Sequence, residues 1–187
     1  MYTSSDIKSN GYNYTAYYCE ENIWRLCEKL IQSGGNLKAI FISNDRKAVP
    51  LWNQRLSDPL RNEGAVLWEY HVIALDGDSR IIYDFDSSIG FKVNFDKYVE
   101  MTFHPEWELD PIFQQKFRVI PAEVYLKTFA SDRSHMINEN GVWRRPPPPQ
   151  SLISTPESKN NIQQFISMDS EVGWGKVMTL HEFISSV

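Results

Sequence analysis

The sequence predicts an α+β protein with a central antiparallel sheet flanked by helices. Segments rich in β-forming residues follow one another in pairs joined by short turns, whereas a parallel sheet needs strands that alternate with helices. An amphipathic helical pattern precedes these strands, and the polar residues 1–13 are expected to form a loose N-terminal segment. The length of 187 residues suits a single compact domain spanning residues 1–187.

An amphipathic helix is predicted to begin at or next to Cys19. Its apolar residues recur at helical spacing and form one stripe: Ile23, Leu26, Cys27, Leu30 and Ile31. Glu20 and Glu21 follow in the first turn, where their charges complement the helix dipole. The pair Gly34-Gly35 supplies the signal that ends the helix.

The strands are predicted from runs of β-forming residues. Residues 37–43 and 48–52 are expected to be strands around a turn at residues 44–46, and residues 53–64 a loop. Residues 65–75 and 80–85 are predicted to form a hairpin across a turn at residues 76–79. The other expected elements are a helix from Asp96 in the ambiguous segment 91–103, a strand at 117–120, a helix from Pro121 to about Phe129, and a short C-terminal helix with a capping box at Thr179 and Glu182.

The turn of the hairpin sets the register of its strands. A loop of two or four residues places Leu75 opposite Arg80, and the same register places His71 opposite Asp84. Directly opposed Cβ atoms lie roughly 4.5–5.5 Å apart on the same face of a sheet. Asp84 is therefore expected to accept a hydrogen bond from the imidazole of His71.

Cys19, His71 and Asp84 together suggest a thiol nucleophile, an imidazole base and a carboxylate that orients the imidazole. Unpaired N–H groups at a helix start lower a thiol pKa and can stabilise an oxyanion. Glu20 and Glu21 would oppose thiolate formation, so a separate base is needed. The alternatives are that Cys19 is a small buried residue, as Cys27 is expected to be, and that His71 and Asp84 form a structural pair.

Two further carboxylates share faces with this pair. Asp86 is expected on the face of Asp84 and Glu69 on the face of His71, where they would raise the imidazole pKa and attract a cationic substrate. The alternative is that both lie at strand ends and are solvated.

Composition excludes several classes of function. The balance of 19 basic and 24 acidic residues gives a net charge of −5, and no basic stripe is visible, so nucleic acid is not an expected partner. No apolar run approaches the roughly 20 residues of a membrane span, and no signal-peptide pattern is present. Cys19 and Cys27 lie about 12 Å apart along one helix and cannot bond to each other. Free thiols indicate a reducing, intracellular compartment.

The remaining motifs point to no cofactor. The histidines have no metal-ligand spacing with the cysteines, and there is no Gly-rich phosphate loop, so neither a metal nor a nucleotide is expected. The proline run, Pro146 to Pro149, is expected to adopt polyproline II geometry. It could bind an SH3-type partner, but such runs more often route the chain over a surface.

Sequence blocks along nearly the whole chain are similar to one known family. The blocks are residues 18–24 (YCEENIW), 41–44 (FISN), 68–72 (WEYHV), 83–86 (YDFD), 117–120 (FRVI), 129–136 (FASDRSHM), 146–149 (PPPP) and 165–169 (FISMD). In these blocks the chain resembles the WDYHV-motif family of protein N-terminal glutamine amidohydrolases. Glu69 stands where the naming motif has Asp, at a position that is not catalytic in the family.

The resemblance implies a cysteine hydrolase with a papain-like or transglutaminase-like core. The family's catalytic residues map onto Cys19, His71 and Asp84, and its members convert an N-terminal glutamine to glutamate with release of ammonia. In eukaryotes this step prepares proteins for arginylation in the N-degron pathway. The resemblance further implies a monomer without a cofactor that acts in cytosol and nucleus on proteins and peptides. Glu21 and Asp86 are candidates for binding the substrate's α-ammonium group.

Three alternatives to this function remain open at the level of sequence. A small cysteine peptidase would use the same residues on a backbone amide, and a transglutaminase would replace water by a lysine amine. A catalytically dead adaptor would use the proline run as its ligand.

Overall fold

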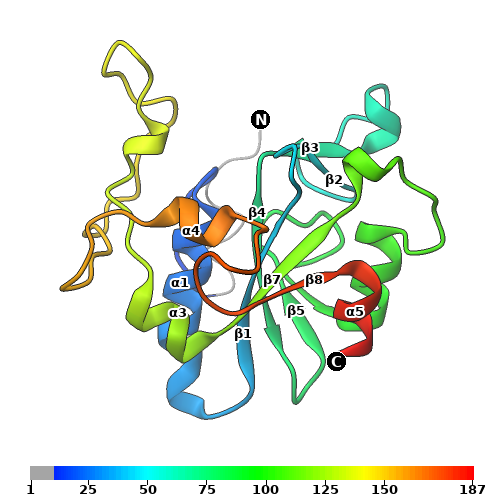
Figure 1. The fold of residues 1–187 in the computed structure, drawn as a ribbon, viewed down its shortest axis with the longest axis horizontal. Helices are drawn as coiled ribbons and strands as arrows, with labels where there is room; N and C mark the ends of the chain where they lie inside the picture. The colour runs from blue at the N-terminus through cyan, green and yellow to red at the C-terminus, as the bar shows by residue number, and fades with distance from the viewer. Residues whose placement is uncertain (1–10) are drawn as a thin grey trace.

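The computed structural model describes residues 11–187 and confirms an α+β fold (Figure 1). Its main sheet has six antiparallel strands in the order β6-β5-β4-β1-β7-β8, and β2 and β3 form a separate two-stranded sheet. The strands are β1 (Leu37–Ser43), β2 (Val49–Leu51), β3 (Val66–Trp68), β4 (His71–Asp76), β5 (Ile81–Tyr83), β6 (Lys92–Asn94), β7 (Lys116–Pro121) and β8 (Lys176–Thr179). The α-helices are α1 (Cys19–Leu30), α2 (Phe95–Tyr98), α3 (Ala122–Thr128), α4 (Ile162–Ile166) and α5 (Leu180–Ser185).

Helices cover both faces of the main sheet. Alternate residues of β1 point to opposite faces, so Ala39 and Phe41 belong to one buried cluster and Ile40 and Ile42 to another. Helices α1, α3 and α4 pack on the first face, whereas α2 and α5 pack on the second, which agrees with the arrangement in Figure 1. The sheet therefore forms the middle layer between two apolar cores.

The structure corrects the pairing expected around residues 44–46. The turn forms, since the Asn44 side chain bonds the backbone of Arg46 and Ala48, but β2 pairs with β3 and not with β1. The long strand expected at 65–75 is divided into β3 and β4. Ser43 Oγ donates to the backbone carbonyl of Glu69 at 2.7 Å, so this side-chain contact occupies that carbonyl at the break.

The hairpin register is shifted by two residues from the prediction. Strand β4 pairs with β5 through Asp76 and Ile81, around a four-residue loop. Within that loop Arg80 has a φ of 54°, and the Asp76 carboxylate accepts hydrogen bonds from Ser79. A two-residue shift keeps every side chain on its expected face. Asp84 therefore still faces His71, although the two are not a ladder pair.

Several helix boundaries also differ from the prediction. Helix α1 starts at Cys19 as expected, but it ends at Leu30 in a short 3₁₀ turn before Gly34. Pro121 ends β7 and caps α3 rather than occupying its first turn. The Thr179 capping box of α5 is confirmed. Strand β8 and helix α4 were not predicted from the sequence. The helix expected from Asp96 starts at Phe95 and continues in a π-helical turn over Val99–Phe103.

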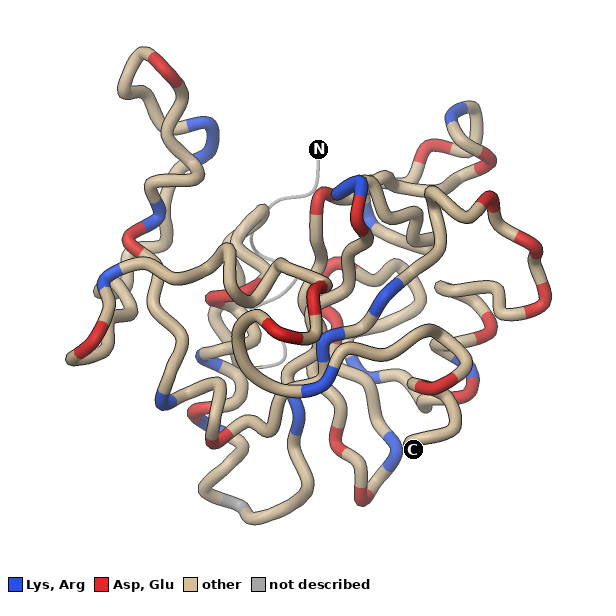
Figure 2. Tube along the Cα trace, viewed as in Figure 1, with Lys and Arg blue, Asp and Glu red and all other residues tan. Residues whose placement is uncertain are grey.

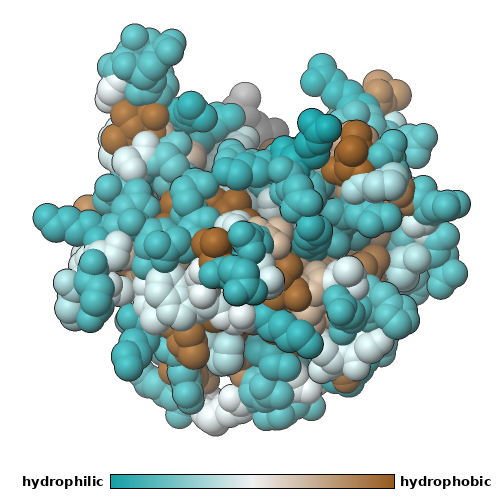
Figure 3. Space-filling model, in the orientation of Figure 1, coloured by the Kyte–Doolittle hydropathy of each residue, from teal (hydrophilic) through white to brown (hydrophobic). Residues whose placement is uncertain are grey.

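The surface carries dispersed charge. In Figure 2 lysine and arginine positions are scattered over several elements, and in Figure 3 the hydrophobic side chains on the visible face form separate patches. Within residues 11–187 no helix is long and apolar enough to cross a membrane. The prediction for residues 1–13 falls mostly on residues 1–10, which lie outside the described part of the chain.

Candidate active site

Cys19 opens helix α1, and the backbone of β4 runs beside it. The residue is 6% exposed and shares a core cluster with Val72, the neighbour of His71. Burial is the largest influence on the pKa of the Cys19 thiol and raises it. The charges of Asp86 and Asp84 raise this pKa as well, and the backbone of Val72 lowers it, so all three residues lie close to the sulfur. The fold thus brings the start of α1, the start of β4 and the residues after β5 to one place.

His71 and Asp84 form a fully buried pair. His71 Nε2 lies 2.9 Å from Asp84 Oδ1, and both side chains are 0% exposed. Burial lowers the pKa of His71, but the neighbouring Asp84 carboxylate outweighs it and the net pKa is raised. Among the described residues Nδ1 of His71 has no hydrogen-bond partner. With Nε2 held by the carboxylate, Nδ1 is the nitrogen free to exchange a proton.

The carboxylate of Asp84 is held by four donors. Oδ1 also accepts from the backbone N–H of Asp86 at 2.9 Å. Oδ2 accepts from Tyr98 Oη at 2.7 Å and from Gln54 Nε2 at 3.3 Å. Burial raises the pKa of Asp84, but His71 and these donors together lower it by more, so the net pKa is lowered. Such an anion can fix the imidazole in one tautomer and stabilise its protonated form.

The pKa of Cys19 differs from the sequence-based expectation. The helix start was expected to lower it, but burial raises the pKa of the Cys19 thiol well above its usual value, and Glu20 and Asp86 add to the effect. The resting thiol is therefore neutral. A base must remove its proton, as the first-turn carboxylates already indicated.

Glu21 does not face an open site. Its carboxylate binds Arg133 through two bonds, with Nε to Oε1 at 2.7 Å and Nη2 to Oε2 at 2.8 Å. These side chains are only 3% and 6% exposed. Arg133 also donates to the backbone carbonyls of Pro148 and Gln150. The role in ammonium binding expected for Glu21 stays a prediction, and this buried ion pair is evidence against it.

Asp86 lies beside the histidine pair. It is 5% exposed and accepts a hydrogen bond from the Tyr14 hydroxyl. Burial raises the pKa of Asp86, and the neighbouring Asp84 adds to this effect. Ligand atoms of His71, Asp84 and Asp86 lie within 4.8 Å of one another, so a metal ion is a geometric possibility. A metal that took Nε2 of His71 as a ligand would have to break its hydrogen bond with Asp84.

The proline run is held against the body of the protein. Pro148 is buried and its carbonyl binds Arg133, while the Tyr18 hydroxyl donates to the carbonyl of Arg145 just before the run. These contacts fit a run that routes the chain over the surface and brings the segment around Arg133 next to α1.

Several residues at the site were not singled out in the sequence. Tyr98 and Gln54 hold Asp84, Arg133 neutralises Glu21, and Tyr70 bonds Glu20. They come from distant segments without a local motif. The family blocks contain Tyr70 and Arg133, which was the one available signal.

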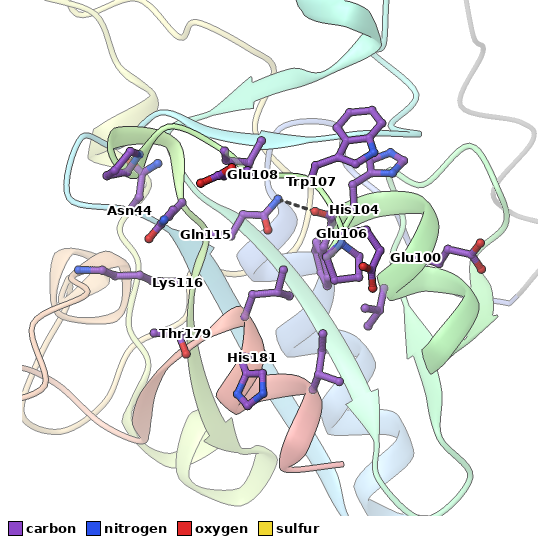
Figure 4. Close-up of a pocket in the computed structure, with 18 of the residues that line it drawn as sticks. Asn44, Glu100, His104, Glu106, Trp107, Glu108, Gln115, Lys116, Thr179 and His181 are labelled. Atoms are coloured by element: carbon purple, nitrogen blue, oxygen red, sulfur yellow. Dashed lines mark hydrogen bonds between the residues drawn. The ribbon is translucent and has the colours of Figure 1, made fainter.

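A hollow lies on the opposite face of the sheet from α1. It encloses about 1260 Å³ between the π-helical turn, the loop after it and α5, and Figure 4 shows Gln115, Lys116 and His181 among its lining residues. None of Cys19, His71 and Asp84 lines it. The chemistry therefore points to the α1 face and not to this hollow.

The fold and site define an α+β protein with a helix-start cysteine beside a buried histidine–aspartate pair. A sequence model described as N-terminal glutamine amidase matches residues 14–187. The chain is 48% identical over 177 residues to the human protein N-terminal glutamine amidohydrolase, covering 91% of this chain and 85% of the human one. It is 44% identical over 178 residues to the Danio rerio protein of that name, covering 91% and 87%. The Drosophila melanogaster protein of the same name is 35% identical over 186 residues, covering 96% and 90%.

The chain belongs to the N-terminal glutamine amidase family. It is an enzyme of the amidohydrolase class.

Proposed function

We propose that this enzyme hydrolyses the side-chain amide of an N-terminal glutamine, leaving N-terminal glutamate and ammonia. The observation that carries the proposal is the buried His71–Asp84 pair beside the first residue of α1, Cys19, in a chain of this family. The names of the relatives support the choice of substrate.

In the proposed mechanism His71 takes the thiol proton and the Cys19 sulfur attacks the carboxamide carbon. The backbone N–H of Cys19, at the start of α1, is the proposed donor to the oxyanion. His71 then gives its proton to the leaving nitrogen, and the C–N bond breaks. Ammonia departs and a thioester remains on Cys19. The imidazole next removes a proton from water, which attacks the thioester carbon. The C–S bond then breaks, the glutamate product leaves, and the imidazolium returns its proton to the Cys19 sulfur. Asp84 keeps the imidazole oriented throughout.

Substrate selection in this proposal depends on the free α-ammonium group. A buried carboxylate near Cys19 would pair with that charge, and Asp86 is one candidate. An acetylated amine would leave the anion unpaired, at a cost of about 3–5 kcal/mol. Asparagine is one methylene shorter, so its amide would not reach the sulfur.

The proposal includes a broader setting that the family resemblance supports. Residues 1–187 would form a single catalytic domain whose core corresponds to that of papain-like and transglutaminase-like enzymes. The enzyme would act as a monomer without a cofactor, in cytosol and nucleus, on proteins and peptides that then enter the arginylation branch of the N-degron pathway.

Four peptides that differ only at the start test the proposed function: Gln, acetyl-Gln, Asn and Gly-Gln. We expect ammonia only from the first, with the mass gain of an amide converted to an acid and no shorter fragments. Chain cleavage would favour a peptidase, and equal turnover of acetyl-Gln or internal Gln would favour a transglutaminase-like enzyme. No turnover of any peptide would favour an adaptor.

A further inference from the structure

Glu20 is a buried carboxylate with one unused oxygen. The residue is 0% exposed, and its Oε2 accepts a hydrogen bond from Tyr70 Oη at 2.9 Å. The same oxygen lies 3.7 Å from Cys19 Sγ. Within residues 11–187 Oε1 accepts no hydrogen bond. A charged oxygen is costly to bury without a partner, so its open position needs an explanation.

His135 supplies a second set of unused polar atoms at the same place. Its Nε2 lies 3.5 Å from Glu20 Oε1, and in the described part of the chain neither ring nitrogen makes a hydrogen bond. The side chain of His135 is 18% exposed, whereas that of Glu20 is 0% exposed. The unused carboxylate oxygen thus has a partly exposed neighbour that can accept a hydrogen bond when neutral.

The other carboxylates near Cys19 already have partners. Glu21 is bound through both oxygens by Arg133, and Asp84 is held by His71 and three further donors. Asp86 accepts from Tyr14. Among the described carboxylates next to the nucleophile, Glu20 is the one that combines complete burial with an oxygen free of hydrogen bonds.

We propose that Glu20, with His135 beside it, binds the α-ammonium group of the substrate and makes the enzyme specific for a chain terminus. This inference rests on the proposed function. An ammonium group offers three N–H donors, and Glu20 Oε1 and the imidazole of His135 provide two acceptors. Tyr70 holds Oε2 and so fixes the orientation of the carboxylate.

The size of one glutamine residue fits this arrangement. Three carbons separate its α-nitrogen from its carboxamide carbon, a distance of about 5 Å when extended. Cys19 Sγ lies 3.7 Å from the Glu20 carboxylate, so one residue can contact both groups. A residue inside a chain has a neutral amide in place of the ammonium and so places no cation beside Glu20. The site therefore selects substrates in which a free amine and a side-chain amide are separated by the length of one glutamine residue.

The test compares two peptides in the intact enzyme and in a Glu20→Gln variant. The first peptide starts with Gln, and the second is its desamino analogue, which has hydrogen in place of the α-amino group. The measured quantity is the ratio of kcat/KM for ammonia release from the two peptides. Because Glu20 also affects ionisation of the thiol, absolute rates will change, but this effect is common to both peptides and cancels in the ratio.

We expect the unmodified enzyme to prefer the amine-bearing peptide by about 10²–10⁴-fold, the preference that corresponds to an unpaired buried charge. In Glu20→Gln the ratio should fall to within about tenfold of unity. Glu28→Gln, on the same helix with a 51% exposed side chain, is the matched control and should keep the full preference. His135→Gln and Tyr70→Phe should each reduce the ratio, and they test the site even where Glu20→Gln does not fold.

An unchanged ratio in Glu20→Gln, or in both supporting variants where Glu20→Gln does not fold, would overturn the assignment. A collapse of the ratio in Asp86→Asn alone would transfer the role to Asp86. These results would leave the proposed function intact, since ammonia would still be released from the Gln peptide. Absence of ammonia release by the unmodified enzyme would instead overturn the proposed function and this inference together.

Discussion

Replacement of Asp84 by Asn should remove most of the activity and leave the fold intact. The four groups that contact the carboxylate all donate, namely His71 Nε2, Asp86 N, Tyr98 Oη and Gln54 Nε2. An amide in this position brings an NH₂ group against two donors. The Tyr98 hydroxyl can become an acceptor and the Gln54 side chain can turn over, because Gln54 Oε1 makes no hydrogen bond within the described residues.

The expected loss in kcat is about 10⁴-fold, as for the corresponding change in other triads. At about 1.36 kcal/mol per factor of ten, this is roughly 5–6 kcal/mol of transition-state stabilisation. The structure attributes it to the lost charge beside the imidazole. Burial lowers the pKa of His71 and the Asp84 carboxylate raises it, so the variant should have a lower His71 pKa.

Two readouts check this account, the rate of ammonia release and its pH profile. The acid limb of kcat/KM reports protonation of the free base, so in Asp84→Asn it should move to lower pH. Asp45→Asn, at a surface carboxylate whose side chain is 74% exposed, is the control and should keep nearly full activity. The reasoning is refuted by an Asp84→Asn enzyme within tenfold of the unmodified rate, or by an Asp45→Asn enzyme that loses as much.

Three further predictions concern the surroundings of the site. Cys27→Ser should leave ammonia release nearly unchanged but lower the free energy of unfolding by about 1–3 kcal/mol, because it buries a hydroxyl at a 0% exposed position. Urea titration and the ammonia assay check this prediction. A large loss of rate would contradict it. Arg133→Met should lower the free energy of unfolding by about 3–5 kcal/mol, because Glu21 is left buried and unpaired. Arg61 has an 83% exposed side chain, so Arg61→Met should lower it by less than about 1 kcal/mol. Equal melting temperatures of these two variants would argue against the buried pair. The pKa of His71 is raised in the folded protein, so the contribution of His71 to stability should be fully present below about pH 6.5 and lost as the pH rises through the folded pKa. The denaturant midpoints of the unmodified enzyme and of His71→Gln should therefore converge with rising pH. Divergence of the two midpoints would contradict the assignment.

The sequence predicted correctly those elements that depend on interactions between residues close together in the chain. The helix start at Cys19 and the Thr179 capping box follow from residues within one or two turns. The predicted hairpin register was wrong because the true register depends on the hydrogen bonds of Asp76 in the turn and on a left-handed backbone at Arg80, which is uncommon for a residue other than glycine. The pairing of β2 with β3 was not predicted because the choice of partner between strands is a long-range property.

The same distinction holds for the site. Cys19, His71 and Asp84 were predicted to be site residues from their own elements, a helix start and a hairpin, and that role stays a prediction. The structure places His71 Nε2 and Asp84 Oδ1 2.9 Å apart. Arg133 lies 112 residues after Glu21, and no local pattern shows that it neutralises that carboxylate. From the sequence, Glu21 and not Glu20 was expected to bind the substrate. The fold instead pairs Glu21 with Arg133 and leaves Glu20 with an oxygen that accepts no hydrogen bond within residues 11–187.

The covalent intermediate gives the most direct test of the proposed mechanism. A Gln-initiated peptide is mixed with the enzyme, the reaction is quenched with acid during the first turnover, and the digested protein is weighed by mass spectrometry. We predict that the fragment containing Cys19 carries the mass of the peptide less one ammonia, and that Cys27→Ser shows the same adduct. Ammonia release by a Cys19→Ala enzyme, or an adduct on Cys27 in place of Cys19, would contradict the mechanism.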